Sequence, residues 1–356
     1  MTMKIPHDRL QKLVTATFQH AGCSPEEAGR IASHLVDANL VGHDSHGVIR
    51  VATYVQWLEA GKVFADRSIQ VTFENEAIAV VDGQAGFGQS IGEQAVRLGI
   101  QKCARHGVSV IALRNSGHLG RIGDWPLMAA RAGILSLHFV NTTGAGILVA
   151  PFGGTQRRLS ANPIAAGVPI HGSDPIVLDI SACTMAEGKI RVALNKEVPV
   201  PEDCIIDAQG KPTTDPKVFY ANPPGAILPI AGHKGYGLAV LCEILAGALT
   251  GGGCSNPKHA DRVINGMLSI YLAPAFFQQD PDFAAEIQRF IAWVKSSPKT
   301  IPDGDILMPG EIEERTKAQR LRDGIDIDPT TWEQLVGAAT SAGVPKTRID
   351  QIMTSA

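Results

Sequence analysis

The chain has 356 residues, of which 44% are hydrophobic and 19% are charged, and its formal net charge is −3. This composition is typical of a globular protein with enough apolar material for a large core. The slightly negative charge excludes a general electrostatic attraction to nucleic acid or to an anionic membrane surface. We therefore expect a small-molecule partner that binds at a local site.

The cysteines and the N-terminal residues indicate a cytoplasmic protein. The N-terminus becomes charged almost at once, without the apolar core of a signal peptide. Later apolar runs are broken before membrane-spanning length, for example by Glu243. The cysteines form no C-x-x-C pair, which favours reduced thiols. They are Cys23, Cys103, Cys183, Cys204, Cys242 and Cys254.

Residues 6–60 predict three helices. The second helix has a clear start, because Ser24 suits the N-cap, Pro25 the first helical position and Glu27 the third, which completes a capping box. From Ile69 onward, short apolar runs separated by glycines alternate with helical stretches, which indicates a β/α region. Strands are expected at 77–81, 108–113, 134–140 and 176–180, and helices at 92–106 and 125–132.

The last third of the chain returns to helices. A helix over 236–249 and a strand over 267–274 precede helices over 282–295, 311–323 and 329–342. The simplest architecture is a mixed α/β protein in which both chain ends form a helical domain and an α/β domain is inserted between them. The expected boundaries are 1–70 for the N-terminal helices, 71–280 for the α/β domain and 281–356 for the C-terminal helices, which pack back on the first part.

The densest group of polar side chains lies in VGHDSHGVIRVATY, between the second and third helices. Asp44 or Ser45 is expected to cap the third helix, and a helix start suits an incoming carboxylate. Arg50 lies about one turn beyond His46, and its planar guanidinium suits bidentate carboxylate binding. The stretch therefore predicts an anion-binding corner. In the alternative interpretation Ser45 caps the helix, both histidines bind carbonyls and Arg50 forms a surface ion pair.

The segment GQAGFGQSIG follows an expected strand and precedes a helix, as a dinucleotide-binding glycine loop does. The spacing is GxGxxxG, and the next strand ends in Arg114 and Asn115, which offers no acidic residue for a ribose. A tight turn explains these glycines equally well. We therefore expect a nucleotide to bind elsewhere, and Gly88→Ala to change stability, if Gly88 needs a positive φ, but not cofactor affinity.

Polar residues follow the ends of several expected strands. His118 lies in a glycine-flanked loop after one of them, where an imidazole is suited to moving a proton, although it could equally be a loop residue without a role. His233 and Lys234 stand at a helix start that suits phosphate, or they form a polar cap. Because strand ends of an open sheet share one edge, these groups suggest a single site. The other strand-end groups are Asn141, Thr142, Thr143, Asp179, Ile180 and Ser181.

The motifs GHDSHGVIR, NSGHLGRIG, LSANPIAAGVP, GHKGYGLAVLCEILAGALTGG and LMPGE stand in this order along nearly the whole chain. Together they resemble the type-2 malate/L-lactate dehydrogenase family, most closely its bacterial hydroxycarboxylate dehydrogenase B subgroup. The resemblance implies a non-Rossmann fold, NAD or NADP as cofactor and, in most members, a homodimer. It also implies interconversion of a 2-hydroxy acid and a 2-oxo acid, with the 2-oxo acid reduced. A cyclic imine carboxylate, or malate or lactate proper, is the alternative substrate.

The same resemblance implies roles for individual residues. His118 corresponds to the proton donor and acceptor, Ser45 and His46 belong to the SHG signature beside cofactor and substrate, and Arg50 is placed to hold the substrate carboxylate. Glu187 departs from the family, since it replaces the usual aromatic residue before GK. The predicted cofactor contacts, from motif and strand-end position, are His46, Gly120, Arg121, Ile122, Asn141, Thr142, Leu178, Asp179, Ile180, Ser181, His233, Lys234, Asn265, Gly310 and Glu311.

Parts of the sequence also suit three other classes of protein. A hydrolase with Ser45 as nucleophile lacks a nucleophile elbow, and the adjacent His46 is not expected to turn back onto the serine. A metal site formed by His43, His46 and His118 has no supporting HExxH or paired-cysteine spacing, so we expect no metal. A binding protein without turnover is the third alternative, and cofactor binding without reaction would be its sign.

Overall fold

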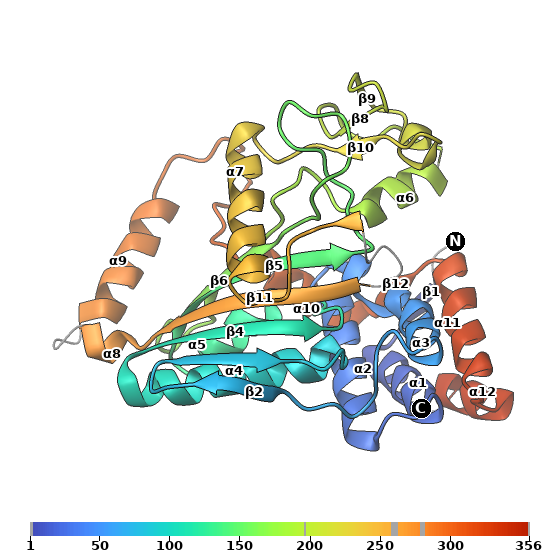
Figure 1. Cartoon of the computed structure of the whole chain (residues 1–356), viewed down its shortest axis with the longest axis horizontal. Helices are drawn as coiled ribbons and strands as arrows, with labels where there is room; N and C mark the ends of the chain where they lie inside the picture. Colours follow the sequence, from blue (N-terminus) through green and yellow to red (C-terminus); the bar gives the residue numbers. More distant parts are fainter. Residues whose placement is uncertain (1–2, 196, 258–262, 278–281, 355–356) are drawn as a thin grey trace.

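The computed structural model describes residues 3–195, 197–257, 263–277 and 282–354. Its centre is a seven-stranded sheet with the order β2-β3-β4-β11-β5-β6-β7 (Figure 1). The strands are β2 (Gln70–Glu74), β3 (Ile78–Asp82), β4 (Val108–Ser116), β5 (Leu135–Gly144), β6 (Ile164–Val168), β7 (Ile176–Ile180) and β11 (Val263–Leu272). The predicted mixed α/β class is confirmed, and β2 and β6 are strands that the sequence did not predict.

The directions of the strands bring several chain segments to one edge of the sheet. β3 and β4 pair in parallel, whereas the other neighbouring pairs described in this sheet are antiparallel. Since β4 and β5 both run antiparallel to β11, and β6 reverses the direction before β7, the strands β4, β5 and β7 end at the same edge. The start of β11 lies there as well. The residues that follow these strands are therefore neighbours in space.

The described helices cover both faces of the sheet, with α4 and α5 on one side and α7 on the other (Figure 1). The helix predicted over 236–249 begins earlier, at His233, and changes from α-helix to π-helix at Glu243–Ala248. The α-helices are α1 (His7–His20), α2 (Pro25–Leu40), α3 (Val51–Glu59), α4 (Gly88–His106), α5 (Asp124–Arg131), α6 (Glu187–Asn195), α7 (His233–Cys242), α8 (Pro274–Phe277), α9 (Asp282–Lys295), α10 (Glu311–Asp323), α11 (Pro329–Ser341) and α12 (Lys346–Thr354).

Both chain ends share one hydrophobic core. Leu13 of α1 and Ile31 of α2 are buried in the same cluster as Leu335 of α11 and Ile352 of α12. A two-stranded sheet adds to this unit, because β1 (Met3–Ile5) pairs antiparallel with β12 (Ile325–Ile327). The packing agrees with a helical unit built from both ends, and the boundaries at residues 70 and 280 stay predictions.

The start of α2 has only half of the predicted capping box. Ser24 Oγ accepts a hydrogen bond from Glu27 N at 3.2 Å, as expected. The Glu27 carboxylate does not return to Ser24, however, because it accepts from Asp66 N at 2.5 Å, while Ser24 N donates to the Asp66 carboxylate at 3.0 Å. Asp66 therefore bonds both Glu27 and Ser24 and attaches the start of α2 to the segment before the large sheet.

A smaller unit stands beside the sheet edge and was not predicted. Its core includes Ile190, Ile205 and Phe219, which are almost fully buried. It contains α6 and a three-stranded sheet of order β10-β8-β9, formed by β8 (Ile205–Ile206), β9 (Pro212–Thr213) and β10 (Ala226–Ile227). Strands of two residues are too short to give an alternation pattern, which explains why the sequence did not indicate them.

Candidate active site

The SHG stretch folds into two short 3₁₀ turns, Asp44–His46 and Val48–Arg50, before α3 begins. The expectation that Asp44 or Ser45 caps α3 is wrong, because the N-cap residue is Arg50 and no side chain caps the helix. The Asp44 carboxylate instead accepts from Asn39 Nδ2 at 2.7 Å and from Arg320 Nη1 at 2.6 Å. These bonds attach the stretch to α2 and α10. The side chains of Ser45, His46 and Arg50 take no part in them and remain available to the site.

His118 and His46 come together although 72 positions separate them in the chain. Their rings are stacked, with centroids 5.7 Å apart and an angle of 8° between the planes. His118 Nδ1 lies 2.6 Å from Tyr54 Oη, and Gln89 Nε2 donates to the same hydroxyl at 3.3 Å. Tyr54 is a site residue that the sequence analysis missed. Its signal was the spacing of four from Arg50, which places both side chains on one face of a helical segment.

The backbone of the His118 loop is held by Asn265 at the start of β11. Asn265 Oδ1 accepts from Leu119 N at 2.9 Å, and its Nδ2 donates to Asn141 O at 3.1 Å and to Thr142 Oγ1 at 2.9 Å. Both the oxygen and the nitrogen of the Asn265 side-chain amide therefore have hydrogen-bond partners within the protein. The predicted residues Asn141, Thr142 and Asn265 thus lie together beside His118, where they support the loop.

Gly88 of the GQAGFGQSIG segment touches this loop directly. A Cβ atom at Gly88 would overlap the carbonyl group of His118. The idea that Gly88 needs a positive φ is wrong, since its φ is not in the left-handed region. What excludes a side chain here is the close approach of α4 to the loop that carries His118. The glycine therefore serves the site through packing, which the turn interpretation did not foresee.

A buried carboxylate lies behind the sheet edge. Glu243, at the start of the π-helix, accepts from Asn141 Nδ2 at 3.1 Å, from Asn162 Nδ2 at 2.9 Å and from Ser255 Oγ at 2.6 Å. π-Helical turns often occur beside functional sites. Glu243 thereby fixes the side chain of Asn141, and the backbone carbonyl of Asn141 in turn accepts a hydrogen bond from Asn265.

Burial and neighbouring cations keep the two site histidines neutral. Burial lowers the pKa of His118 well below its ordinary value, and Arg50 and His46 lower it further. Burial, followed by Arg50, lowers the pKa of His46 to about 3. Burial raises the pKa of Tyr54 to about 12. The sequence indicated a proton donor and acceptor at His118, and in the free protein the lowered pKa of His118 favours the neutral ring.

Arg50 is the cation available to an anionic ligand. Its Nε donates to Ser45 O at 2.6 Å, which orients the guanidinium. Within the described ranges no carboxylate forms an ion pair with Arg50. The alternative in which Arg50 forms a surface ion pair is therefore not seen there. The guanidinium retains donors that could bind a carboxylate.

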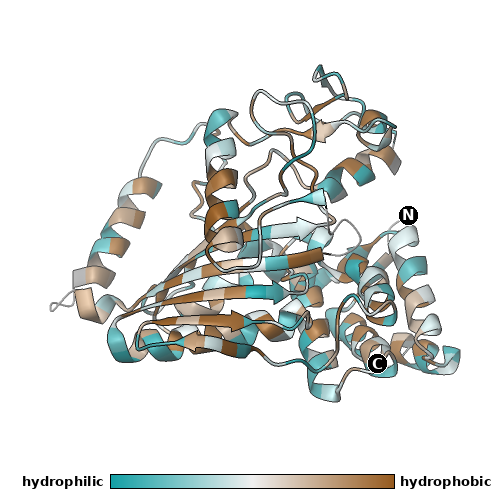
Figure 2. Ribbon diagram, viewed as in Figure 1, coloured by the Kyte–Doolittle hydropathy of each residue, from teal (hydrophilic) through white to brown (hydrophobic). Residues whose placement is uncertain are grey.

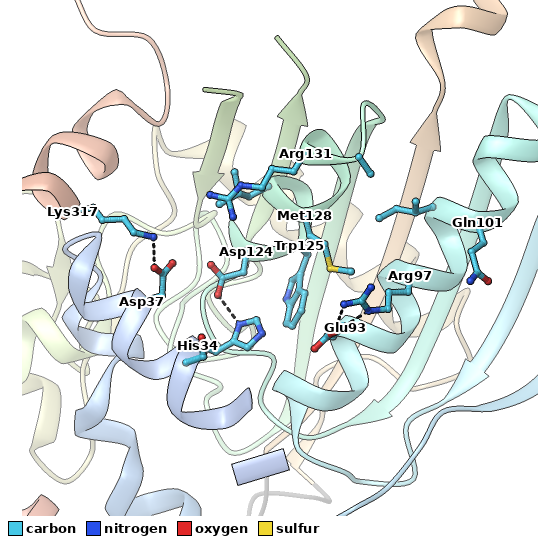
Figure 3. A pocket seen from close by; sticks show the side chains of 14 residues that line it. His34, Asp37, Glu93, Arg97, Gln101, Asp124, Trp125, Met128, Arg131 and Lys317 are labelled. Atoms are coloured by element: carbon cyan, nitrogen blue, oxygen red, sulfur yellow. Dashed lines mark hydrogen bonds and ion pairs between the residues drawn. The ribbon is translucent and has the colours of Figure 1, made fainter. Parts of the chain in front are cut away.

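A hydrogen bond from a backbone N–H to a carboxylate joins the segment after β4 to the end of β7, and an ion pair lies beside it. Asp179 Oδ2 accepts from Gly123 N at 2.8 Å, and burial raises the pKa of Asp179. Arg121 is 5% exposed, and its Nε donates to Asp124 Oδ1 at 2.8 Å. Asp124 also faces His34 Nδ1 at 3.0 Å (Figure 3). Arg121 is thus held by carboxylates of the protein itself.

The other predicted cofactor residues border the same edge of the sheet. His233 and Lys234 are exposed at the start of α7, and the turn before them is tied to the segment after β7, since Ile230 N donates to Ala182 O at 3.0 Å. The Glu311 carboxylate accepts from Met308 N at 3.0 Å. The remaining members are buried or half-buried at the strand ends or at the start of α10: Gly120, Ile122, Leu178, Ile180, Ser181 and Gly310.

A groove of about 650 Å³ lies between α2, α4, α5 and α10 (Figure 3). Its charged side chains are largely paired, for example Asp37 with Lys317 and Glu93 with Arg97. Neither His118 nor His46 lines it. The groove shares Asp124 with the ion pair described above, but the stacked histidines lie outside it.

The geometry bears on the alternative functions. Ser45 Oγ lies 3.1 Å from His46 Nδ1, so the expectation that His46 cannot reach the serine is wrong. A triad still lacks its third member, because among the described residues no carboxylate hydrogen-bonds to His46. His43 Nε2 faces Glu313 Oε1 at 3.3 Å, so the three histidines proposed for a metal do not converge. None of the described helices has the length and apolar character needed to cross a bilayer.

The fold and the site define a class: a non-Rossmann α/β protein with two stacked, buried histidines and an arginine whose guanidinium can receive a carboxylate. Residues 5–336 match the model of the malate/L-lactate dehydrogenase family. The chain belongs to this family, as the motifs of its sequence implied.

Individual relatives are similar along their whole length. Hydroxycarboxylate dehydrogenase B of Escherichia coli strain K12 is 40% identical over 341 residues, which are 95% of this chain and 94% of the relative. The solved structure of sulfolactate dehydrogenase from Methanocaldococcus jannaschii superposes with a TM-score of 0.85 at 34% identity and covers 98% of this chain and 99% of that one. A Δ1-piperideine-2-carboxylate reductase from Pseudomonas syringae has a TM-score of 0.82 at 28% identity, covering 95% and 100%.

Proposed function

We propose that this protein is a nicotinamide-dependent dehydrogenase that interconverts 2-hydroxy acids and 2-oxo acids and acts as a 2-oxo acid reductase. The observation that carries the proposal is the pairing of His118 with Tyr54 beside Arg50. His118 supplies proton transfer, and Arg50 supplies the positive charge that binds a carboxylate. The relatives named hydroxycarboxylate and sulfolactate dehydrogenase support the same reaction class.

The residues available for a dinucleotide fit its chemistry. Gly120 and Ile122 after β4, Leu178 and Asp179 in β7, and the start of α10 at Gly310 all border one edge of the sheet. A long ligand can contact all of them at once. His233 and Lys234 at the start of α7 could receive phosphate, because helix-start N–H groups and the two side chains favour negative charge. When bound, the nicotinamide supplies the hydride for reduction and accepts it in oxidation.

Substrate binding prepares His118 for its role. Burial is the largest cause of the lowered pKa of His118 in the free protein, and the charge of Arg50 lowers the pKa further. A carboxylate bound at Arg50 offsets the charge of that guanidinium, which raises the pKa of His118 and favours uptake of a proton by the ring. In reduction His118 then protonates the substrate oxygen, and in oxidation the neutral ring removes the hydroxyl proton. The negative charge of the substrate therefore makes protonation of His118 more favourable than it is in the free protein.

Tyr54 keeps His118 oriented throughout this cycle. A phenol can donate to a bare Nδ1 or accept from Nδ1–H, so the 2.6 Å contact persists in both protonation states. The opposite nitrogen, Nε2, is left for the substrate. His46, stacked on His118, and Ser45, bonded to His46, form the wall beside the reacting group.

A cyclic imine carboxylate is the second candidate substrate. Its ring nitrogen would receive the proton that a 2-oxo acid accepts on oxygen, and its carboxylate would bind Arg50 in the same manner. The likeness to the piperideine-2-carboxylate reductase of Pseudomonas syringae favours this candidate.

A homodimer is also proposed. Hydrophobic residues make up much of α7 and its π-helical continuation (Figure 2). This segment exposes Leu241 at 41% and Ile244 at 52%, and α9 exposes Trp293 at 71%. Large exposed apolar side chains mark an interaction site where they gather on one face of a protein. A second copy of the chain would cover it, and light scattering of the purified protein measures this. A cytoplasmic location, favoured by the scattered cysteines, stays a prediction.

Oxidation of NADH and NADPH, followed at the nicotinamide absorbance band with a panel of 2-oxo acids and a cyclic imine carboxylate, tests the function. We expect turnover with at least one 2-oxo acid, unchanged by a chelator. Activity lost with the chelator would point to a metalloenzyme. Cofactor binding without turnover on any compound would contradict the proposal.

A further inference from the structure

Gln89 gives the segment GQAGFGQSIG a role that the proposed cofactor contacts do not use. It lies in the first turn of α4 and is completely buried. Its Nε2 donates to Tyr54 Oη at 3.3 Å and faces the carbonyl oxygen of His118 at 3.5 Å. A carbonyl oxygen only accepts hydrogen bonds, so the amide nitrogen of Gln89, and not its oxygen, belongs on this side. The backbone of the His118 loop therefore fixes the orientation of the Gln89 amide.

The direction of the hydrogen bond between Tyr54 and His118 follows from this donor. Burial raises the pKa of Tyr54 to about 12, so the hydroxyl keeps its single hydrogen at neutral pH. The Tyr54 oxygen already accepts from Gln89. The rings packed beside Tyr54, those of Trp57 and Phe87, offer no acceptor for its hydrogen. The hydroxyl hydrogen therefore points to His118 Nδ1, 2.6 Å away.

The same contacts determine which nitrogen of the His118 ring carries a hydrogen. The ring is neutral in the free protein, because burial lowers the pKa of His118 well below its ordinary value. A neutral imidazole has one N–H group, so a ring that accepts at Nδ1 carries its hydrogen on Nε2. In the opposite tautomer Nδ1 would donate to the Tyr54 oxygen, and the Tyr54 hydrogen would need a new acceptor. The Gln89 amide would have to rotate to supply one, which would bring its oxygen against the carbonyl oxygen of His118.

We propose that Gln89 is a positioning residue that acts through Tyr54 and holds His118 in the Nε2–H tautomer. The chemical consequence rests on the dehydrogenase function proposed above. Nε2 is the nitrogen left for the substrate, so the free protein offers a hydrogen-bond donor to the carbonyl oxygen of a 2-oxo acid. Removal of the hydroxyl proton from a 2-hydroxy acid needs a bare Nε2, so the ring must first shift its hydrogen to Nδ1. The free site is therefore prepared for reduction.

A long-range proton–nitrogen NMR spectrum of the free protein, with nitrogen-15 in its histidines, tests the tautomer directly. A ring nitrogen that carries a hydrogen and a bare one differ widely in chemical shift, and the signals of His118 are those missing from His118→Ala. We expect the Nε2–H tautomer to exceed the Nδ1–H tautomer at least about 10-fold, because the minor form leaves a buried polar group unpaired. Comparable populations, or a His118 ring with a bare Nε2, would overturn the inference.

Two substitutions test the part played by Gln89. Gln89→Glu replaces the donating nitrogen by an acceptor, so Tyr54 should donate to the carboxylate and His118 Nδ1 should carry a hydrogen. Gln89→Met removes the donor without adding charge and should let both tautomers appear. Gln101→Glu makes the same change at an exposed position of α4, about 18 Å along the helix, and should leave the His118 signals unchanged. Wild-type His118 signals in both Gln89 variants would show that Gln89 does not set the tautomer.

The effect on reduction is measured separately from the tautomer. If the proposed function holds, single-turnover reduction by Gln89→Met should slow roughly 3- to 10-fold, with the dissociation constant for NADH within about 2-fold of the wild type. A normal rate in a variant that populates both tautomers would show that the tautomer does not prepare the site for reduction. The NMR measurement needs neither cofactor nor substrate, so failure of the dehydrogenase function and failure of the tautomer assignment are told apart.

Discussion

Tyr54 Oη and His118 Nδ1 lie 2.6 Å apart, which joins α3 to the loop that follows β4. Tyr54 is almost fully buried, and Gln89 donates to the same hydroxyl. The contact orients the imidazole and leaves Nε2 for the substrate. Tyr54 is therefore a positioning residue for the proposed acid–base group.

Tyr54→Phe should lower kcat by roughly 5- to 100-fold, because removing the hydroxyl leaves a buried Nδ1 without its partner. The KM for the 2-oxo acid and the affinity for NADH should change little, since Arg50 and the cofactor contacts are retained. Tyr271→Phe is a matched control, because Tyr271 is as deeply buried in β11 and packs against His138 instead of His118. Equal effects of both substitutions on kcat would remove Tyr54 from the mechanism.

Arg50→Lys should weaken the 2-oxo acid more than the cofactor. A lysine keeps the charge but cannot form two parallel hydrogen bonds to a carboxylate. The KM for the 2-oxo acid should rise roughly 10- to 100-fold, given the size of charged hydrogen bonds. Arg131→Lys, at an exposed arginine of α5, is the control. An unchanged KM, or equal losses for substrate and cofactor, would contradict the assignment.

The sequence predicted those parts of the site that lie close together in the chain or carry a family motif. Ser45, His46 and Arg50 fall within six positions, and His118 stood out in a glycine-flanked loop. Tyr54 was in the same stretch but gained its role from a loop 64 positions away. Such a contact has no local pattern, so it required the three-dimensional structure.

Long amphipathic helices were predictable for the same reason that short strands were not. The apolar stripe of α2 repeats over four turns, and its residues are buried as the pattern indicated. β1 and β8 have three and two residues, which is too few for a period to be seen. The low pKa of His118 was equally hidden, because it depends on burial and on Arg50 from another segment.

Gly88→Ala should displace His118 and lower kcat, since the added methyl group overlaps the His118 carbonyl. The melting temperature should fall as well. Affinity for NADH should stay near that of the wild type, because the cofactor is proposed to contact other segments. Gly29→Ala in α2 meets no atom within 4 Å and should instead stabilise the helix slightly. A Gly88 variant that turns over normally would show that the loop can move without cost.

Acid should destabilise the protein through His138. This buried ring lies between Ser136 Oγ at 3.0 Å and Ser269 Oγ at 2.9 Å, and burial lowers its pKa from 6.5 to about 3. The unfolded chain takes up a proton below pH 6.5, whereas the folded protein does not until about pH 3. The stabilisation is therefore complete above pH 6.5 and is lost as the pH falls toward 3, by about 2 kcal/mol at pH 5.

Urea unfolding at pH 7 and pH 5 measures this effect. The free energy of unfolding should fall between the two pH values, and His138→Gln should reduce that fall by about 2 kcal/mol whatever its effect at pH 7. An identical pH dependence in wild type and variant would show that His138 is not held neutral.

The most direct measurement is the single-turnover rate of His118→Ala with saturating NADH and 2-oxo acid. If His118 is the proton donor, the rate falls by about two to four orders of magnitude, while the dissociation constant for NADH stays within about 2-fold of the wild type. His171→Ala, at an exposed histidine remote from the site, should behave as the wild type. A His118→Ala enzyme that turns over at a near-normal rate would contradict the account.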